Sequence, residues 1–218
     1  MMTSYARISM SGWHKRMGRK AEATKANILA IAITEFAERG FDGARINVIA
    51  EKAKINKERI YAYFESKEGL YTAVVDETYG RVVTAEEPLS ALTENDAERM
   101  TERIISLYFD FHRAHPEFSR ILVWENLGGG GYAKDFGTRR KKIFGHLAAI
   151  YDAGRRRGVF KNDVSFESYI FTLTAVSFFY FSNLRTMSRT LSLNLSDTDV
   201  TGRIVRECIA LLSRSGGD

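Results

Sequence analysis

The sequence predicts an all-α protein, and three observations carry that prediction. Proline, which breaks helices, occurs only at Pro88 and Pro116 in the 218 residues. Apolar residues recur at spacings of three and four along most of the chain, the period of one face of an α-helix. Alternating runs bounded by turn residues, which would indicate strands, do not stand out. We therefore expect about nine helices and no sheet.

The first three helices are expected to form a small unit near the N-terminus. A basic flexible tail over residues 1–20 precedes a helix over about residues 22–39, which Gly40 ends. Two shorter helices follow, over about residues 46–53 and 57–64. The apolar residues at helical spacing are Leu29, Ala32, Ile33 and Phe36 in the first helix, Ile46, Ile49, Ala50 and Ala53 in the second, and Ile60 and Phe64 in the third.

Six longer elements complete the prediction. Ser66 can cap the first of them. A polar loop over residues 84–96 and a flexible glycine-rich loop over residues 128–131 separate them. The expected helices cover about residues 67–83, 100–115, 117–126, 136–157, 164–189 and 197–214.

Composition and charge limit the classes of protein to which this chain can belong. Hydrophobic residues make up 44% and charged residues 27%, an ordinary globular composition that supports a packed core. The net charge of +5 is a weak indication of a polyanionic partner. Its distribution says more, because residues 1–64 contain twelve Lys and Arg against six Asp and Glu, a difference of +6.

The sequence favours a cytoplasmic protein with no membrane partner. Its single cysteine, Cys208, excludes an intrachain disulfide and a cysteine-based metal cluster. Residues 1–20 lack the apolar segment of a secretory signal. The most apolar stretch, residues 169–181, is too short to cross a hydrocarbon layer of roughly 30 Å, so we interpret it as a buried helix.

Three short helices of this size are the minimal helix-turn-helix unit, because the last two cannot bury a core without the first. The third helix has an inward side, with Ile60 and Phe64, and a polar side. Amides, cations and hydroxyls on that side suit base edges and phosphates. The polar side consists of Asn56, Lys57, Glu58, Arg59, Tyr61 and Tyr63.

The same region resembles a known family. The pieces IA-x-x-A at 49–53, IY-x-YF at 60–64 and SKE-x-L at 66–70 have the mutual spacing found in the TetR (tetracycline repressor) family of bacterial regulators. The resemblance implies a helix-turn-helix domain over residues 21–68 and an effector-binding and dimerisation domain over residues 69–218. By position it also implies DNA contacts from Arg45, Asn47, Lys57, Glu58, Arg59, Tyr61, Tyr63 and Lys67.

What the family implies beyond these residues concerns regulation. Its members are homodimers in which two C-terminal helices of each subunit form a four-helix bundle. Their middle helices enclose a small-molecule effector, whose binding moves the two DNA-reading units apart. The resemblance therefore implies operator DNA, a second copy of the chain and an unidentified effector as partners, with repression as the expected mode of regulation.

Two residues depart from the family pattern. Lys54 stands where a glycine is usual in the turn, so the turn is either reshaped or strained by on the order of 1 kcal/mol. Glu58 puts an acid on the DNA-reading helix. It can accept a hydrogen bond from a cytosine amine, repel phosphate or pair with a neighbouring cation.

Other candidate sites carry less weight. Trp124, Asn126, Phe178 and Tyr180 are candidate effector contacts, although the aromatic ones equally suit a core or a dimer interface. His112 and His115 lack further metal ligands, and no catalytic constellation stands out, so we expect no enzyme, cofactor or metal. The alternative function is a helical ligand-binding protein or enzyme with a basic helical head and no specific DNA target. Salt-dependent binding to a specific duplex distinguishes the two.

Overall fold

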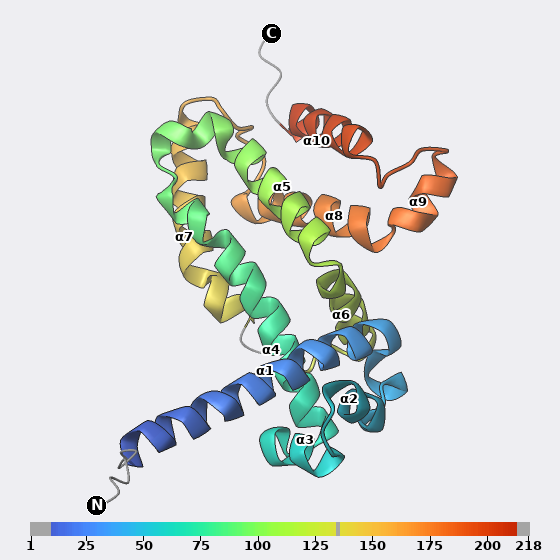
Figure 1. Cartoon of the computed structure of the whole chain (residues 1–218). Coiled ribbons are helices and arrows are strands. Elements are labelled where there is room, and N and C mark those ends of the chain that lie inside the picture. The colour runs from blue at the N-terminus through green and yellow to red at the C-terminus, as the bar shows by residue number, and fades with distance from the viewer. Residues whose placement is uncertain (1–9, 134–135, 213–218) are drawn as a thin grey trace, which may run out of the picture. The chain divides into compact units, whose positions relative to one another are not determined.

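The chain folds into helices wherever the structure describes it (Figure 1). A computed structural model describes residues 10–133 and 136–212, with side chains from residue 20 onward, and these ranges contain ten α-helices, two short 3-10 helices and no strand. The all-α prediction is confirmed. The chain divides into two compact units, Met1–Val75 and Asp76–Asp218, so the division falls beyond the boundary predicted after residue 68.

The first unit contains α1 (Met10–Gly43), α2 (Ile46–Ala53), α3 (Lys57–Phe64) and the start of α4 (Lys67–Glu86). α2 packs against both α1 and α3. The apolar stripes predicted for these helices form the core, although Leu29 is only partly buried. The buried apolar side chains of α1, α2 and α3 include Ile28, Ala32, Ile33, Phe36, Ile46, Ile49, Ala50, Ala53, Ile60 and Phe64.

The first helix begins earlier than predicted. A flexible tail was expected over residues 1–20, but α1 begins at Met10, and residues 1–9 lie outside the described part. Residues 10–21 contain no proline and several Lys, Arg and Met, which favour helix, so the packed helix extends toward the N-terminus. At Gly40, φ of 67° and ψ of −177° fall in a region that glycine alone adopts readily, and α1 is kinked at the predicted stop.

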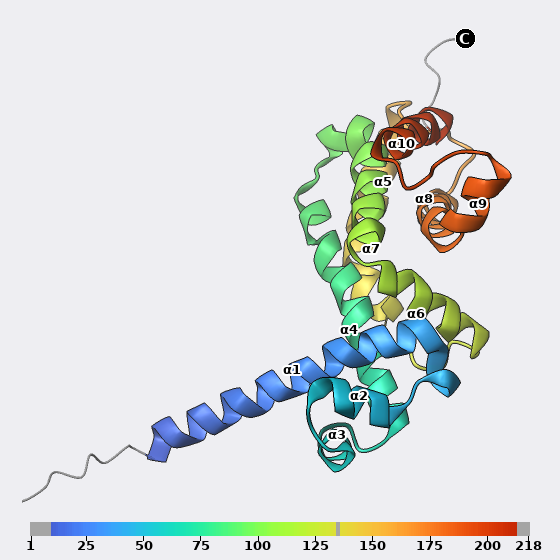
Figure 2. The ribbon, with the colours of Figure 1, turned by 45° about the vertical axis from the view of Figure 1, so that its right-hand side comes forward.

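The second unit contains the rest of α4, two 3-10 helices, η1 (Glu87–Ala91) and η2 (Glu94–Asp96), and six further α-helices. These are α5 (Ala97–Ala114), α6 (Pro116–Leu127), α7 (Phe136–Arg156), α8 (Phe166–Ser182), α9 (Leu184–Thr190) and α10 (Thr198–Leu212). α5 packs against α7, α8 and α10 and lies at the centre of the unit (Figures 1 and 2). None of the helices in the described ranges is both long and apolar enough to cross a membrane.

Two predicted elements differ from the observed ones. The polar loop predicted over residues 84–96 is largely η1 and η2, because α4 continues to Glu86. The helix predicted over residues 164–189 is divided into α8 and α9, which brings the described helices to ten. Asn183 divides them, since its side-chain amide donates to the Phe179 carbonyl at 3.3 Å and to Ser182 Oγ at 2.9 Å. Such local bonds compete with the backbone ladder of a helix.

The glycine-rich loop after α6, predicted to be flexible, is tied back to that helix. Glu125 is buried, and its Oε1 accepts hydrogen bonds from the backbone N–H groups of Tyr132 at 2.6 Å and Ala133 at 3.2 Å. Gly129 and Gly130 have φ of 90° and 72°, values that favour glycine. The glycines therefore give the loop the curvature that brings its end to the carboxylate.

Candidate functional site

The turn between α2 and α3 depends on one strained residue. Lys54 has φ of 56° and ψ of 44°, the left-handed conformation. Its N–H donates to the Glu51 carbonyl at 3.0 Å, and the Ile55 N–H donates to the Ala50 carbonyl at 3.0 Å. This conformation costs a non-glycine residue on the order of 1 kcal/mol. Of the two alternatives for this position, the strained turn is the one observed.

A side-chain cap and two buried residues fix the orientation of α3. Asn56 caps the helix, because its Oδ1 accepts a hydrogen bond from the Arg59 N–H at 3.1 Å. Ile60 and Phe64 are buried against the rest of the unit. The opposite side faces solvent, where 39% of Tyr61 is exposed. Tyr63, one of the other predicted contacts, is half-buried.

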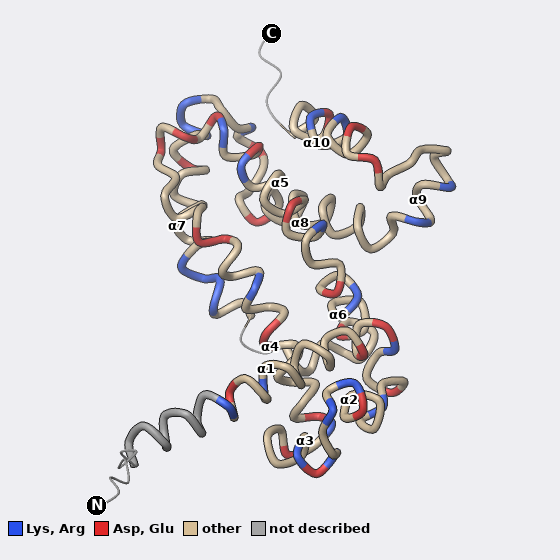
Figure 3. Tube along the Cα trace, in the orientation of Figure 1, with Lys and Arg blue, Asp and Glu red and all other residues tan. Residues whose placement is uncertain are grey.

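The cations predicted to contact DNA are accessible. Arg45, Lys57 and Arg59 are exposed, and none of them forms an ion pair with another side chain that the structure describes. Asn47 is exposed as well. Glu58 lies in the first turn of α3, where the helix dipole favours an acid, and within the described part it pairs with no cation. Figure 3 shows Lys and Arg on α2 and α3 interspersed with acidic residues.

Lys67, the last of the predicted DNA contacts, also has partners within the chain. Its Nζ donates to the backbone carbonyl of Asp42 at 3.3 Å and lies 4.9 Å from the centre of the Phe41 ring. These contacts join the start of α4 to the end of α1. Ser66 caps α4 as predicted, because its Oγ accepts a hydrogen bond from the Gly69 N–H at 3.0 Å.

A buried ion cluster that the sequence analysis missed joins α1 to α2. The side chain of Glu35 is completely buried, with Lys52 Nζ 3.1 Å from its Oε2 and Arg39 Nε 3.1 Å from its Oε1. The signal in the sequence is an acid beside Phe36, within the apolar stripe of α1.

In the second unit, the four predicted effector contacts have different surroundings. Trp124 and Asn126 lie on the exposed side of α6, where 38% of Trp124 is exposed. Phe178 is half-buried, with its ring centre 6.3 Å from that of His112. Tyr180 is buried, and its hydroxyl bonds to the Leu195 carbonyl at 2.8 Å and to a threonine hydroxyl of α10 at 3.0 Å. That hydroxyl therefore joins α8 to α10.

A buried polar network lies where α4 ends. Arg140 Nε donates to Glu86 Oε2 at 2.9 Å, and its Nη2 donates to Glu86 Oε1 and, at 2.8 Å, to the Tyr108 hydroxyl. Tyr108 itself donates to Glu86 Oε1 at 2.8 Å, and burial raises the pKa of its phenol well above the usual range. The guanidinium also lies 4.3 Å and 4.9 Å from the ring centres of Phe144 and Phe136. The network thus joins α4, α5 and α7.

A second buried contact joins α5 to α6. His112 Nδ1 lies 2.8 Å from Ser119 Oγ, and the imidazole stacks on Phe181 with ring centres 5.5 Å apart. Burial lowers the pKa of His112 to about 4, so the ring is neutral at physiological pH. In the part of the chain that the structure describes, no three His, Cys, Asp or Glu side chains lie close enough together to hold a metal ion.

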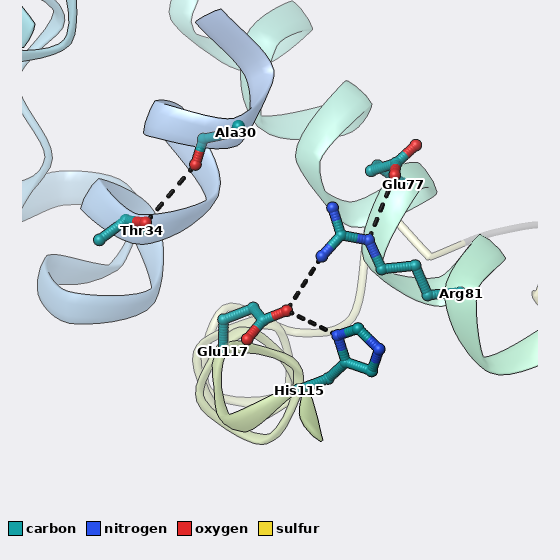
Figure 4. Close-up of polar contacts among 6 residues, drawn as sticks. All are labelled: Ala30, Thr34, Glu77, Arg81, His115 and Glu117. Carbon is teal, nitrogen blue, oxygen red and sulfur yellow. Dashed lines mark hydrogen bonds and ion pairs between the residues drawn. The ribbon is translucent and has the colours of Figure 1, made fainter. Parts of the chain in front are cut away.

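A partly buried polar cluster joins α4 to the start of α6 (Figure 4). Arg81 Nη1 donates to Glu117 Oε1 at 3.0 Å, and Arg81 Nε donates to Glu77 Oε1 at 3.2 Å. His115 Nδ1 lies 3.1 Å from the same Glu117 oxygen. α4 is therefore held in the second unit by this cluster as well as by the Glu86 network.

Comparisons with known proteins match both units. Residues 28–74 match the family model described as bacterial regulatory proteins, tetR family. Residues 98–211, just over half of the chain, match the model of the tetracyclin repressor-like C-terminal domain. The chain belongs to the TetR family. It is a DNA-binding transcriptional regulator, as the sequence predicted.

Individual TetR-family relatives agree with this assignment. The HTH-type transcriptional repressor NicS of Pseudomonas putida is 34% identical over 182 residues, which cover 82% of this chain and 85% of that protein. The HTH-type transcriptional repressor SCO4008 of Streptomyces coelicolor is 32% identical over 159 residues, covering 73% and 79%. The solved structure of the Streptomyces coelicolor regulator SCO4942 has a TM-score of 0.67 at 20% identity, covers 88% of this chain and 98% of its own, and shows the same fold.

Proposed function

We propose that this chain is a repressor that binds operator DNA as a homodimer and leaves the DNA when a small-molecule effector binds its second unit. The observation that carries the DNA side of this proposal is the exposed, unpaired cations around α3 in the described structure. Cations without intrachain partners can bind phosphates at no cost of breaking an ion pair. The names of NicS and SCO4008, both repressors, support the direction of regulation.

The proposed DNA contacts fall into two groups. Residues with no side-chain ion pair in the described part are proposed to reach phosphates or base edges directly: Arg45, Asn47, Lys57, Glu58, Arg59, Tyr61 and Tyr63. Asn56 and Lys67 combine a proposed DNA contact with the intrachain bonds described above. A phosphate contact contributes to binding at every sequence alike, whereas a base contact contributes about 1–3 kcal/mol selectively.

Selection of duplexes from a random DNA pool by the purified chain tests this proposal and yields the operator sequence. Lys57→Ala together with Arg59→Ala should then greatly weaken binding to the selected duplex. Lys141→Ala with Lys142→Ala is the matched control, since it removes two exposed cations from α7 in the other unit. Unchanged affinity of the α3 variant for the selected duplex would rule out α3 as the DNA-reading helix.

The dimer is proposed from large apolar side chains left exposed on α8 and α10. Phe171 is 71% exposed, Phe179 53% and Leu211 79%. Exposed apolar surface of this kind marks a protein interface, and identical subunits usually pair about a two-fold axis. Sedimentation at micromolar concentration should show a dimer, and Phe171→Glu with Phe179→Glu should give a monomer. A monomeric wild-type chain would contradict the proposal.

The effector is proposed to bind in the second unit, with Trp124, Asn126, Phe178 and the ring of Tyr180 as contacts. α4 runs from Lys67 to Glu86 and carries residues of both units, so a ligand that displaces α4 can alter DNA binding. A ligand shifts this equilibrium only by the difference in its affinity for the two forms.

A screen of small metabolites for release of the selected duplex tests the effector proposal. Trp124→Ala and Asn126→Ala should shift the concentration at which an effector acts. If both variants respond as wild type does, the effector binds elsewhere. If no small molecule releases DNA, the effector proposal fails while DNA binding stands.

A further inference from the structure

Glu35 is an acid at a position in α1 where the helical pattern calls for an apolar residue. It follows Ala32 by three positions and precedes Phe36, and both of these are buried. The side chain of Glu35 is 0% exposed. Among the side chains that the structure describes in the first unit, it is the one buried charged group.

The partners of Glu35 reach it from the surface of the unit. Lys52 of α2 donates from Nζ to Glu35 Oε2 at 3.1 Å, and the Lys52 side chain is 49% exposed. Arg39, one turn further along α1, brings Nε to 3.1 Å from Glu35 Oε1 and is 57% exposed. Oε1 nevertheless accepts no hydrogen bond within the described part, so the carboxylate is only partly satisfied.

Stability alone does not account for this arrangement. A buried ion pair seldom stabilises a protein more than apolar residues of similar volume would, because two charges must lose their water. A partly satisfied carboxylate is less favourable still. A hydrogen-bonded ion pair requires a particular geometry, whereas apolar burial has no preferred direction. The Glu35–Lys52 bond therefore defines how α2 is rotated and placed against α1.

We propose that the Glu35–Lys52 pair is a positioning device for DNA recognition. α2 leads through the strained turn at Lys54 directly into α3, so an error in the placement of α2 is passed to the DNA-reading side chains. The pair also occupies Lys52, which would otherwise add sequence-independent attraction for phosphates. Glu35 thus increases the discrimination between operator and other DNA, a role that rests on the DNA binding of this unit.

The test compares two duplexes on the full-length chain. One is the duplex selected from a random pool, and the other is a scrambled duplex of equal length and composition. Glu35→Gln should bind the selected duplex at least ten-fold more weakly and the scrambled duplex as well as, or better than, wild type. The dependence of log affinity on log salt should steepen by about 0.9 for each freed cation that reaches a phosphate.

Glu38→Gln is the matched control, because Glu38 is an exposed acid of α1 only three residues away. This variant removes the same charge and should leave the ratio of the two affinities unchanged. If Glu35→Gln lowers both affinities in parallel, or leaves their ratio unchanged, Glu35 has only a structural role and the proposal is overturned.

A second pair of variants applies if Glu35→Gln does not fold. Lys52→Met changes a half-exposed partner of Glu35 and keeps the aliphatic stem. It should reduce the ratio of the affinities for the selected and the scrambled duplex. Lys52→Arg, which keeps the cation, should preserve that ratio. An unchanged ratio in Lys52→Met overturns the proposal. If the wild-type chain selects no duplex at all, the proposed DNA binding itself fails. That outcome differs from a changed affinity ratio and from an unchanged one in the variants.

Discussion

The two units of this regulator differ in where they place their polar groups. In the described part of the first unit, Glu35 is the one buried charged residue, and most of the groups proposed to contact DNA are exposed. The second unit buries polar residues on most of its helices: Thr78, Glu86, Thr101, His112, Ser119, Glu125, Arg140, Ser177 and Thr201. Buried polar groups require specific partners, so the interior of the second unit depends on correct pairing between helices. The polar groups of interest in the first unit therefore face solvent, whereas many polar groups of the second unit face its core.

Removing the Arg140 cation from the buried network should have the largest effect on stability among these tests. Arg140→Met leaves the Glu86 carboxylate buried without its cation and should lower the free energy of unfolding by about 3–5 kcal/mol. Urea unfolding followed by circular dichroism measures the loss. The control is Arg139→Met, because the neighbouring Arg139 pairs with Asp76 at the surface and contributes about 0–1 kcal/mol. A loss below that of the control would contradict the importance of buried pairing.

The neutral His112 should make the second unit sensitive to acid. Burial lowers its pKa to about 4 in the folded chain, against about 6.5 when unfolded. Between these values the unfolded chain binds more protons, so stability is complete above about pH 6.5 and falls as pH decreases toward 4. The loss of unfolding free energy from this one group is at most about 3 kcal/mol.

His112→Asn isolates this contribution. The difference in unfolding free energy between pH 7 and pH 4.5 should be smaller in the variant than in wild type, whatever constant loss the substitution itself causes. Equal pH dependence in the two proteins would show that the buried imidazole does not resist protonation.

Close packing around glycine provides a third comparison of the units. A Cβ at Gly69 would lie 2.0 Å from the Phe64 carbonyl oxygen, whereas a Cβ at Gly154 would lie 2.6 Å from a carbon of the Phe160 ring. A backbone oxygen moves less readily than a side chain. Both substitutions by alanine should therefore lower the free energy of unfolding by about 1–3 kcal/mol, and Gly69→Ala should lower it more than Gly154→Ala. At Gly145 nothing lies within 4 Å, and alanine should stabilise α7 by about 0.5–1 kcal/mol. Thermal unfolding gives the order, and the reverse order for the first two would contradict the model of rigid packing in the first unit.

The last test concerns the strained turn at Lys54. Lys54→Gly should be more stable than Lys54→Ala by about 1 kcal/mol, because only glycine adopts the left-handed conformation without strain. Both substitutions remove the same charge, so the comparison isolates the backbone. Equal stability of the two variants would mean that the turn relaxes.

The sequence predicts features that depend on neighbouring residues. The apolar stripes of α1, α2 and α3 and the Ser66 cap follow from spacing or local conformation. The sequence left two alternatives for the turn at Lys54, and the strained one is observed. The sequence also predicts the exposed side of α3, because Ile60 and Phe64 fix the inward side.

Features that depend on packing between helices were missed. Arg140 and Glu86 are 54 positions apart, and Lys52 and Glu35 are 17 apart, so neither pairing has a local signal. The buried hydroxyl of Tyr180 likewise finds partners that only the tertiary fold supplies. The division at Asn183 was missed for another reason, since the apolar residues on both sides continue the helical period.

The carboxylate of Glu125 has a consequence for the solvent exchange of the loop after α6. Its two hydrogen bonds withdraw the amide protons of Tyr132 and Ala133 from water, although Tyr132 directly follows four glycines and Ala133 is the next residue. In deuterated solvent these two protons should therefore persist far longer than is usual in a surface loop, and each exchange event requires the loop to detach from the carboxylate. Their exchange rates thus record how often the loop opens.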